Sequence, residues 1–81
     1  MIFNETALRG AFIVEPQLMR DDRGFYARTW CQKEFKAQGL NPSLVQCGVS
    51  FNHKKGTLRG MHYQVAPHGQ AKLVRCGRGS L

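Results

Sequence analysis

Glycine, proline and aspartate interrupt the chain at short intervals, and this punctuation limits it to short elements of secondary structure. The runs between these residues are extended in character or rich in aromatics, and no long stretch shows helical periodicity of apolar residues. A chain of 81 residues is one small domain at most, and a domain near this size buries only roughly 60% of the surface that its unfolded chain exposes. The sequence therefore predicts a mainly β fold with a thin core.

The first half of the sequence predicts two strands and one helix. Gly10–Val14 is expected to be a strand ended by Pro16, and a hairpin is expected across the turn Asp21–Gly24, leading into an aromatic-rich strand over Gly24–Trp30. Cys31–Gln38 contains good helix formers and is the one predicted helix. Phe35 is its expected inward anchor, and Gly39 is expected to stop it.

The second half returns to a β pattern. Its expected strands, separated by polar or proline-containing loops, are Leu44–Gln46, Val49–Phe51, Thr57–Val65 and Ala71–Cys76. There is no internal repeat and no linker-like stretch. We therefore predict a single partial domain over residues 1–81, with too few strands for its sheet to close.

Composition excludes several classes of protein. A hydrophobic content of 42% is that of a globular chain, and no apolar run approaches the roughly 20 residues that span a bilayer. The N-terminus lacks a basic region followed by an apolar stretch, so a cytoplasmic protein without a membrane partner is expected. Three widely spaced cysteines without a Cys-x-x-Cys pair favour small buried thiols over disulfides or a zinc knuckle.

A formal charge of +7 is the strongest compositional bias. It raises the local concentration of anions such as phosphates, nucleic acid or acidic surfaces. The plainer alternative is that the chain is a fragment whose acidic residues lie elsewhere. The sequence leaves both interpretations open.

Candidate chemistry gathers on two neighbouring extended segments. In the predicted strand Thr57–Val65, side chains alternate, so Arg59 and His62 diverge unless Gly60 allows a bend or bulge. Lys72 is expected to share a face with Val74 and Cys76, both of which prefer burial. A lysine on such a face needs a partner or a function.

Structural alternatives exist for each of these residues. By spacing alone, His62 is as consistent with a structural role as with a functional one, and Arg75 and Arg78 fit an ordinary basic face. His53 and His68 fall in loops and are expected to be exposed. No His-x-His pair or acidic ligand accompanies the histidines, so no metal site is predicted.

Three strings together resemble a known family. Asp22–Tyr26, Leu58–Gln64 and Gln70–Cys76 are similar to the N-terminal part of the dTDP-4-dehydrorhamnose 3,5-epimerases, and the Leu-Arg-Gly-x-His-Tyr-Gln string with a lysine ten residues after its histidine is the most specific of them. The resemblance implies a partial cupin-like jelly roll with one short helix, truncated in mid-sheet. It also implies a homodimer, no metal or organic cofactor, and a place in the biosynthesis of dTDP-L-rhamnose or a related deoxysugar.

The resemblance also implies roles for individual residues. His62 would be the general base that removes the C3 and C5 protons of a dTDP-4-keto-6-deoxyhexose, and Lys72 would stabilise the enolate oxygen. These roles suit the chemistry, because a carbon acid beside a ketone needs a base of near-neutral pKa and positive charge at the developing oxyanion. The implied substrate-binding residues are Arg23, Phe25, Tyr26, Gln46 and Arg59.

Two positions depart from the family pattern. Arg28 stands where the family often has a glutamate, and Gly48 where it often has an asparagine. By the resemblance, the carboxylate partner of the base and the tyrosine general acid lie beyond Leu81. This chain alone is therefore expected to be inactive.

Two alternatives to the epimerase hypothesis remain. The charge and the aromatic residues are also consistent with a small basic module that binds nucleic acid or another polyanion, although no nucleic-acid motif is present. The other is a non-catalytic relative that keeps the sheet without the chemistry. The epimerase hypothesis itself includes no nucleic-acid partner.

Overall fold

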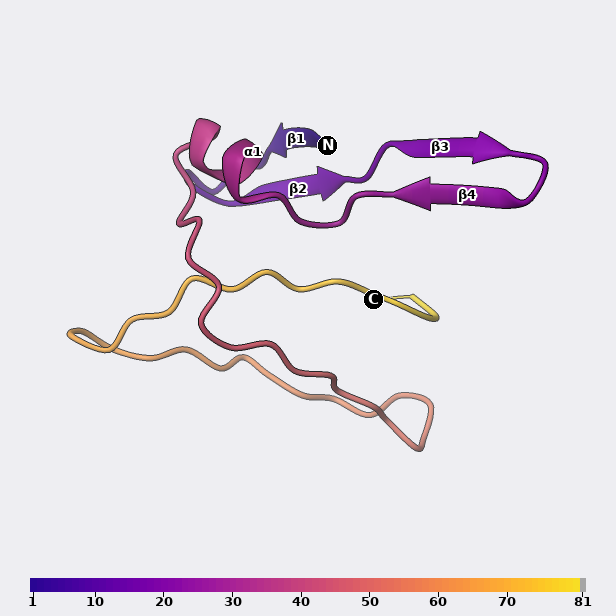
Figure 1. The fold of residues 1–81 in the computed structure, drawn as a ribbon. Helices are drawn as coiled ribbons and strands as arrows, with labels where there is room; N and C mark the ends of the chain where they lie inside the picture. Colours follow the sequence, from indigo (N-terminus) through magenta and orange to yellow (C-terminus); the bar gives the residue numbers. More distant parts are fainter. Residues whose placement is uncertain (81) are drawn as a thin grey trace. The chain divides into compact units, whose positions relative to one another are not determined.

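The computed structural model describes residues 1–80, and all of its regular structure lies within residues 2–37. Four strands of four residues precede one short helix, and the strands form two separate antiparallel pairs, β1 with β2 and β3 with β4 (Figure 1). The elements are β1 (Ile2–Glu5), β2 (Phe12–Glu15), β3 (Leu18–Asp21), β4 (Gly24–Ala27) and α1 (Gln32–Ala37). The mainly β prediction with one helix is confirmed.

Contacts within the chain separate it into two compact units, Met1–Cys47 and Gly48–Leu81. All five elements belong to the first unit. The single domain over residues 1–81 stays a prediction. The helix α1 has six residues and is far too short to cross a bilayer, and no longer helix occurs among residues 1–80.

The β1–β2 pair presents one apolar face. Its register places Phe3 opposite Val14 and Glu5 opposite Phe12, so these four side chains share a face. Phe3, Phe12 and Val14 are half-buried, whereas Ile13 on the other face is exposed. This difference identifies the face that carries the core.

Phe35 on α1 is the centre of that core. The residue is 5% exposed and is the only one among residues 1–80 that is buried as a whole. Its ring centroid lies 5.3 Å from that of Phe3 in an edge-to-face arrangement and 6.2 Å from that of Trp30. Phe12 extends the cluster, with its ring 6.4 Å from that of Phe3. Phe35 as inward anchor is confirmed.

The end of α1 is set by Gly39. The Gly39 N–H donates to the Lys36 carbonyl and the Leu40 N–H to the Phe35 carbonyl, both at 3.0 Å, which is the hydrogen-bond pattern of a Schellman motif. Gly39 has φ of 74°, which a residue with a side chain adopts only at a cost. The predicted stop is confirmed, and the helix is one residue shorter at each end than predicted.

The β3–β4 hairpin confirms the predicted turn at Asp21–Gly24. The Asp21 carboxylate accepts from the Arg23 backbone N–H at 2.9 Å, and Gly24 has φ of 135°. The hairpin extends away from β1, β2 and α1 (Figure 1). Isolated two-stranded hairpins are marginally stable, which agrees with its exposed faces.

Strand boundaries were predicted less well. The strand predicted over Gly10–Val14 is observed as β2, and the one predicted over Gly24–Trp30 ends at Ala27. No strand was predicted over β1, and β3 was implied only as the first arm of the predicted hairpin, without bounds. Both are stabilised by pairing, β1 with β2 and β3 with β4.

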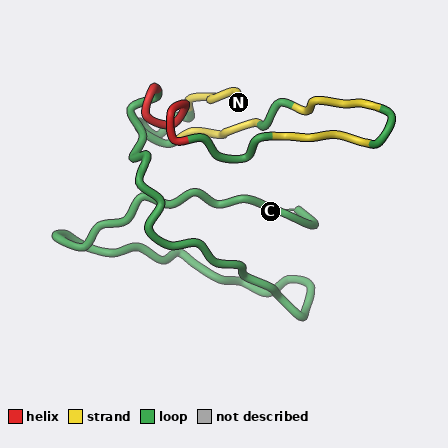
Figure 2. The backbone as a smooth tube through the Cα atoms, viewed as in Figure 1, coloured by secondary structure: helices red, strands yellow, loops and turns green. Residues whose placement is uncertain are grey.

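The strands predicted after residue 41 are wrong. Residues 41–80 contain no strand, as the loop colouring of Figure 2 shows, and neither Thr57–Val65 nor Ala71–Cys76 pairs with another segment. A strand exists only where a neighbour supplies hydrogen bonds. The apolar side chains stay in water, with Val49 98% and Leu58 92% exposed.

The cysteine prediction is also wrong in part. All three thiols are free, as expected, but Cys31 is only half-buried, and Cys47 and Cys76 are exposed. Cys47 and Cys76 are exposed because no core forms among residues 41–80 to enclose them.

An ion-pair network connects the start of β1 with α1. The Met1 ammonium lies 2.9 Å from Glu34 Oε1, and Arg28 Nη1 lies 3.2 Å from Glu34 Oε2. The hydrogen bond from the Met1 ammonium is the largest cause and lowers the pKa of Glu34; desolvation opposes it, and the hydrogen bond from Arg28 lowers the pKa to a lesser extent. The hydrogen bond between Arg28 and Glu34 raises the pKa of Arg28.

Removal of the Phe35 ring is expected to unfold the first unit. Phe35→Ala should cost about 3 kcal/mol or more, because the ring at the centre of the core is lost from a marginal fold. Trp30, which packs on Phe35, reports the change as a red shift of its emission. Phe25→Ala, at a position 62% exposed, is the matched control and should leave the emission unchanged. Equal shifts for both variants would contradict the proposed core.

Acid is expected to weaken the connection between β1 and α1. The pKa of Glu34 is lowered from 4.5, so its contribution to stability is present above that pH and is lost as the pH falls through the folded-state pKa. An acid titration followed by Trp30 emission should show this component in the unsubstituted chain but not in Glu34→Gln. Glu15→Gln should retain it. Persistence of the component in Glu34→Gln would rule out this ion pair as its origin.

Candidate functional site

Lys72 and His62 come together in the second unit. The Lys72 ammonium donates from Nζ to the backbone carbonyl of His62 at 2.9 Å, although ten residues separate them. The chain reverses between them through a turn in which the His68 N–H donates to the Val65 carbonyl at 2.9 Å. A cation is therefore held beside the residue that carries the candidate base.

An open hollow adjoins this turn. It is lined by Tyr63, Gln64, Val65 and His68. None of these residues was assigned a role from the sequence, and only the Tyr-Gln pair that follows His62 within the motif pointed to them. The hollow offers apolar and amide surface at the residues that follow His62 in the chain.

Arg59 is bound to a different part of the second unit. Its guanidinium donates from Nη2 to the Phe51 carbonyl at 2.9 Å, and the Phe51 ring meets the His53 ring edge-to-face at 5.2 Å. Gly60, the next residue, has φ of 126°, a conformation that disfavours any side chain. Gly60, named from the sequence as the residue that could allow a bend, thus has a conformation open mainly to glycine, but Thr57–Val65 is not a strand and no hydrogen bond brings Arg59 to His62.

Exposure distinguishes these residues from an enclosed catalytic centre. His62, Lys72 and Arg59 are all exposed, as are His53 and His68, which were predicted to be. The prediction that Lys72 shares a buried face with Val74 and Cys76 is wrong, since both neighbours are exposed. Water reaches the candidate base and cation, whereas electrostatic stabilisation of an oxyanion is strongest where water is excluded.

The remaining candidate residues belong to the first unit. Arg23, in the β3–β4 turn, is paired with Asp21 through a 2.6 Å contact from Nη2 to Oδ2. This hydrogen bond lowers the pKa of Asp21 and raises that of Arg23. Because the Arg23 side chain is 90% exposed, the pair adds little stability and leaves the guanidinium accessible to an anion.

Two aromatic residues follow Arg23 on β4. Phe25 and Tyr26 are more than half exposed, and the Arg20 guanidinium lies 5.6 Å from the centre of the Phe25 ring. Phe25 shares a face with Arg20, whereas Tyr26 faces the side of Met19. Gln46, also in the first unit, is exposed.

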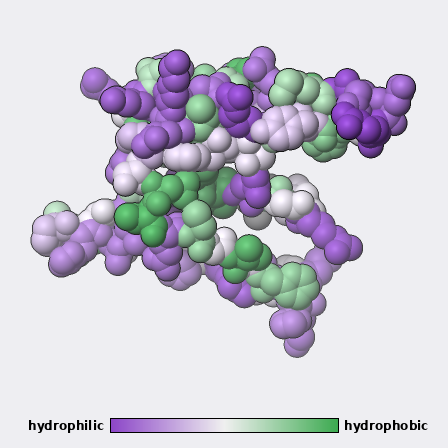
Figure 3. Space-filling model, viewed as in Figure 1, coloured by the Kyte–Doolittle hydropathy of each residue, from purple (hydrophilic) through white to green (hydrophobic). Residues whose placement is uncertain are grey.

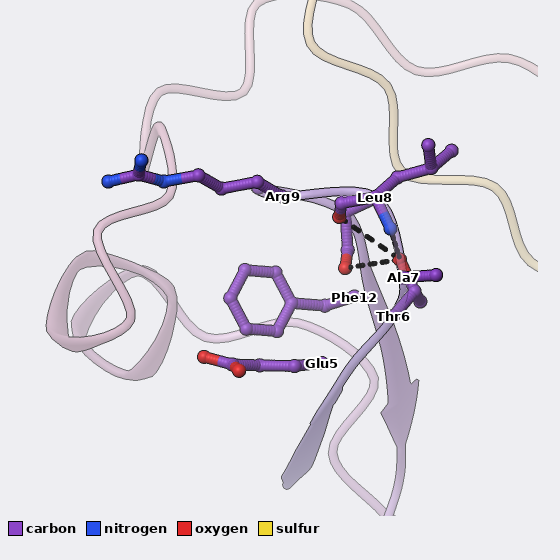
Figure 4. A pocket seen from close by; sticks show the side chains of 8 residues that line it. Glu5, Thr6, Ala7, Leu8, Arg9 and Phe12 are labelled. Carbon is purple, nitrogen blue, oxygen red and sulfur yellow. Dashed lines mark hydrogen bonds between the residues drawn. The ribbon is translucent and has the colours of Figure 1, made fainter.

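A second hollow, formed by the loop between β1 and β2 and the strand residues that flank it, contains none of the predicted site residues. Its lining runs from Glu5 to Phe12, and in Figure 4 the Phe12 ring lies between the Arg9 and Glu5 side chains. The Thr6 hydroxyl shapes the loop by hydrogen bonds to the Leu8 and Ala11 carbonyls at 3.1 and 3.0 Å. Hydroxyl-to-backbone bonds of this kind are a local turn signal.

The two departures from the family pattern differ in their consequences. Arg28 forms the ion pair with Glu34 already described, so it has a structural partner in the first unit. Gly48 has open space around it, and a Cβ there would meet no atom within 4 Å. Among residues 1–80 there is no group of three histidine, cysteine or acidic side chains able to hold a metal ion.

A mainly β chain with a lysine held at a histidine is similar over almost its whole length to epimerases of nucleotide-linked sugars. The family described as dTDP-4-dehydrorhamnose 3,5-epimerase matches residues 5–81, and the chain belongs to that family.

Individual relatives agree with this assignment. The chain is 35% identical over 81 residues to the dTDP-4-dehydrorhamnose 3,5-epimerase of Sinorhizobium fredii, covering 100% of this chain and 42% of the relative. It is 41% identical over 78 residues to the enzyme of that name from Shigella flexneri, covering 95% and 42%. The chain therefore spans less than half the length of these relatives. No solved structure matches it.

The contact between Lys72 and His62 can be tested in the isolated chain. Lys72→Met is expected to move the carbonyl ¹³C signal of His62 upfield, because the carbonyl loses a charged hydrogen-bond donor. Arg75→Met removes a neighbouring cation that does not bond to His62 and should leave the signal in place. Identical spectra for Lys72→Met and the unsubstituted chain would exclude the contact.

Proposed function

We propose that the whole protein to which this chain contributes is a dTDP-4-dehydro-6-deoxy-D-glucose 3,5-epimerase that serves the synthesis of dTDP-L-rhamnose or a related deoxysugar. The observation that carries the proposal is the Lys72 ammonium held at the His62 carbonyl, in a chain whose family is named for this reaction. Neither the charge nor the β fold would suggest this reaction alone. The specific motif and the observed contact together support it.

Proton abstraction is the proposed role of His62. The imidazole takes the proton from C3 or C5, next to the C4 ketone, and the electron pair moves into the ring and onto the C4 oxygen as an enolate. A neutral imidazole suits this step because its ordinary pKa is close to neutral pH. Return of a proton to the opposite face of the same carbon inverts its configuration and regenerates the ketone.

Lys72 is proposed to stabilise the enolate. An ammonium beside His62 places positive charge near the reacting carbons, where the negative charge develops. Arg59 is proposed to help place the substrate, for which its guanidinium would have to exchange the Phe51 carbonyl for a substrate oxygen. No residue of this chain is assigned the role of the acid that returns the proton.

The β3–β4 hairpin is proposed to bind the nucleotide. A guanidinium is suited to a diphosphate, because its donors match the phosphate oxygens, and exposed aromatic rings offer stacking surfaces for a base. Arg23, Phe25 and Tyr26 supply these groups, and the diphosphate would compete with Asp21 for Arg23. Gln46 is proposed as a further pocket residue. The whole protein is proposed to be a cytoplasmic homodimer that works without a cofactor.

The experiment replaces the matched portion of the Shigella flexneri relative with this chain and follows deuterium uptake from D₂O at C3 and C5 of the 4-keto sugar nucleotide. His62→Asn is expected to slow the uptake by about 10²–10⁴-fold, the usual contribution of a positioned acid or base. His53→Asn, at another exposed histidine of the same unit, should exchange like the unsubstituted chimera. Undiminished uptake in His62→Asn, or a folded chimera without uptake, would contradict the proposal.

A further inference from the structure

Two arginines near the turn of the β3–β4 hairpin are held in different ways. Arg23, in the turn, is bound to Asp21, whose carboxylate accepts from the Arg23 backbone N–H at 2.9 Å and from its Nη2 at 2.6 Å. Arg20, on β3, has its guanidinium 5.6 Å from the centre of the Phe25 ring on β4. Hydrophilic side chains gather at this end of the hairpin (Figure 3). Arg23 is the proposed ligand of the diphosphate, and Arg20 has no role in that proposal.

The register of the hairpin connects these two contacts. Arg20 lies directly opposite Phe25, and the next pair towards the turn is Asp21 opposite Gly24. Because Gly24 has no side chain, Arg20 and Phe25 form the cross-strand side-chain pair that is nearest to the turn. Side chains directly opposite each other are the pairs that stabilise an antiparallel ladder.

Short strands leave the register of this hairpin weakly fixed. Each strand has only four residues, and a two-stranded hairpin is marginally stable by itself. A slip of one residue would move Arg20 to the other face and displace Asp21 from its position beside the turn. The cation–π contact opposes such a slip, because it requires Arg20 and Phe25 to share a face.

We propose that Arg20 is a positioning residue for nucleotide binding. Its contact with Phe25 fixes the end of the hairpin, and Asp21 thereby holds Arg23 where the diphosphate binds. Arg20 and Asp21 are adjacent on β3 and face opposite sides of the hairpin, so Arg20 does not share the side on which Asp21 binds Arg23. Arg20 therefore acts through Phe25 and Arg23 rather than on the nucleotide itself. The inference rests on the proposed function, since it concerns the same substrate.

The first test follows the hairpin in this chain without any nucleotide. Arg20→Met retains an unbranched side chain but removes the planar cation. It is expected to speed amide exchange of Arg23, whose N–H donates to Asp21, at least about twofold. Arg9→Met, in the loop between β1 and β2, removes the same charge and should leave this exchange unchanged. Unchanged exchange in Arg20→Met would contradict the proposal, and so would a shift of Trp30 emission, because the effect would then not be confined to the hairpin.

The second test measures the nucleotide in the chimera with the Shigella flexneri relative. Arg20→Met is expected to weaken the binding of dTDP, followed by calorimetry, and to raise KM by about two- to fivefold, the size of one exposed cation–π contact. The value of kcat should not change, because Arg20 touches neither the sugar nor its reacting carbons. Arg9→Met is the matched control and should alter neither quantity.

Double variants show whether Arg20 acts through its neighbours. Once Phe25→Leu has removed the ring, Arg20→Met should alter the affinity for dTDP by less than about 1.5-fold. The same small effect is expected once Arg23→Met has removed the proposed ligand of the diphosphate. Full additivity with either variant would mean that Arg20 contacts the nucleotide itself or acts elsewhere, and would contradict the positioning role.

Three further results would overturn the proposal. They are an unchanged affinity for dTDP in Arg20→Met, a fall in kcat with KM unchanged, and equal losses of affinity in Arg20→Met and Arg9→Met. Failure of the epimerase proposal is a different result. In that case the unsubstituted chimera would take up no deuterium at C3 and C5, whatever the affinity of its variants for dTDP.

Discussion

Burial of the Phe35 ring organises the ordered part of this chain. Phe35 is the only residue buried as a whole among residues 1–80, and its ring contacts rings from β1 and from the segment before α1. The Schellman motif at Gly39 ends α1 after about one and a half turns, and Phe35 on this short helix packs against Phe3. A core this small depends on each of its members. The ion pairs of Glu34 with the Met1 ammonium and Arg28 connect the same elements, β1 and α1.

Signals contained in a few adjacent residues were predictable from the sequence, and signals that depend on a distant partner were not. The turn at Asp21–Gly24 and the stop at Gly39 follow from local conformational preferences, and both were predicted. The Thr57–Val65 run has strand character, but pairing requires a second backbone, and the described chain offers it none. Pairing also accounts for β1, which was not predicted from the sequence and is stabilised by β2.

The candidate site shows the same division. The motif around His62 identified the family correctly, because residue identity at fixed spacing is contained in the sequence itself. The contact from Lys72 to the His62 carbonyl agrees with the predicted association of the two residues, but the predicted burial of Lys72 depended on a sheet that does not form. Arg59 binds a carbonyl eight residues away, a contact that no spacing rule anticipates. Residues 48–80 therefore expose the candidate site residues, their apolar side chains and their cations together, and no other part of this chain covers or neutralises these groups.

Backbone pairing, rather than local sequence character, decides which half of the chain forms regular structure. Backbone assignment of the isolated chain by NMR, with secondary chemical shifts and cross-strand nuclear Overhauser effects, tests this directly. We expect β shifts and cross-strand effects for Ile2–Glu5 with Phe12–Glu15, helical shifts in Gln32–Ala37, and coil-like shifts through residues 48–80. Cross-strand effects between Thr57–Val65 and Ala71–Cys76 would contradict it.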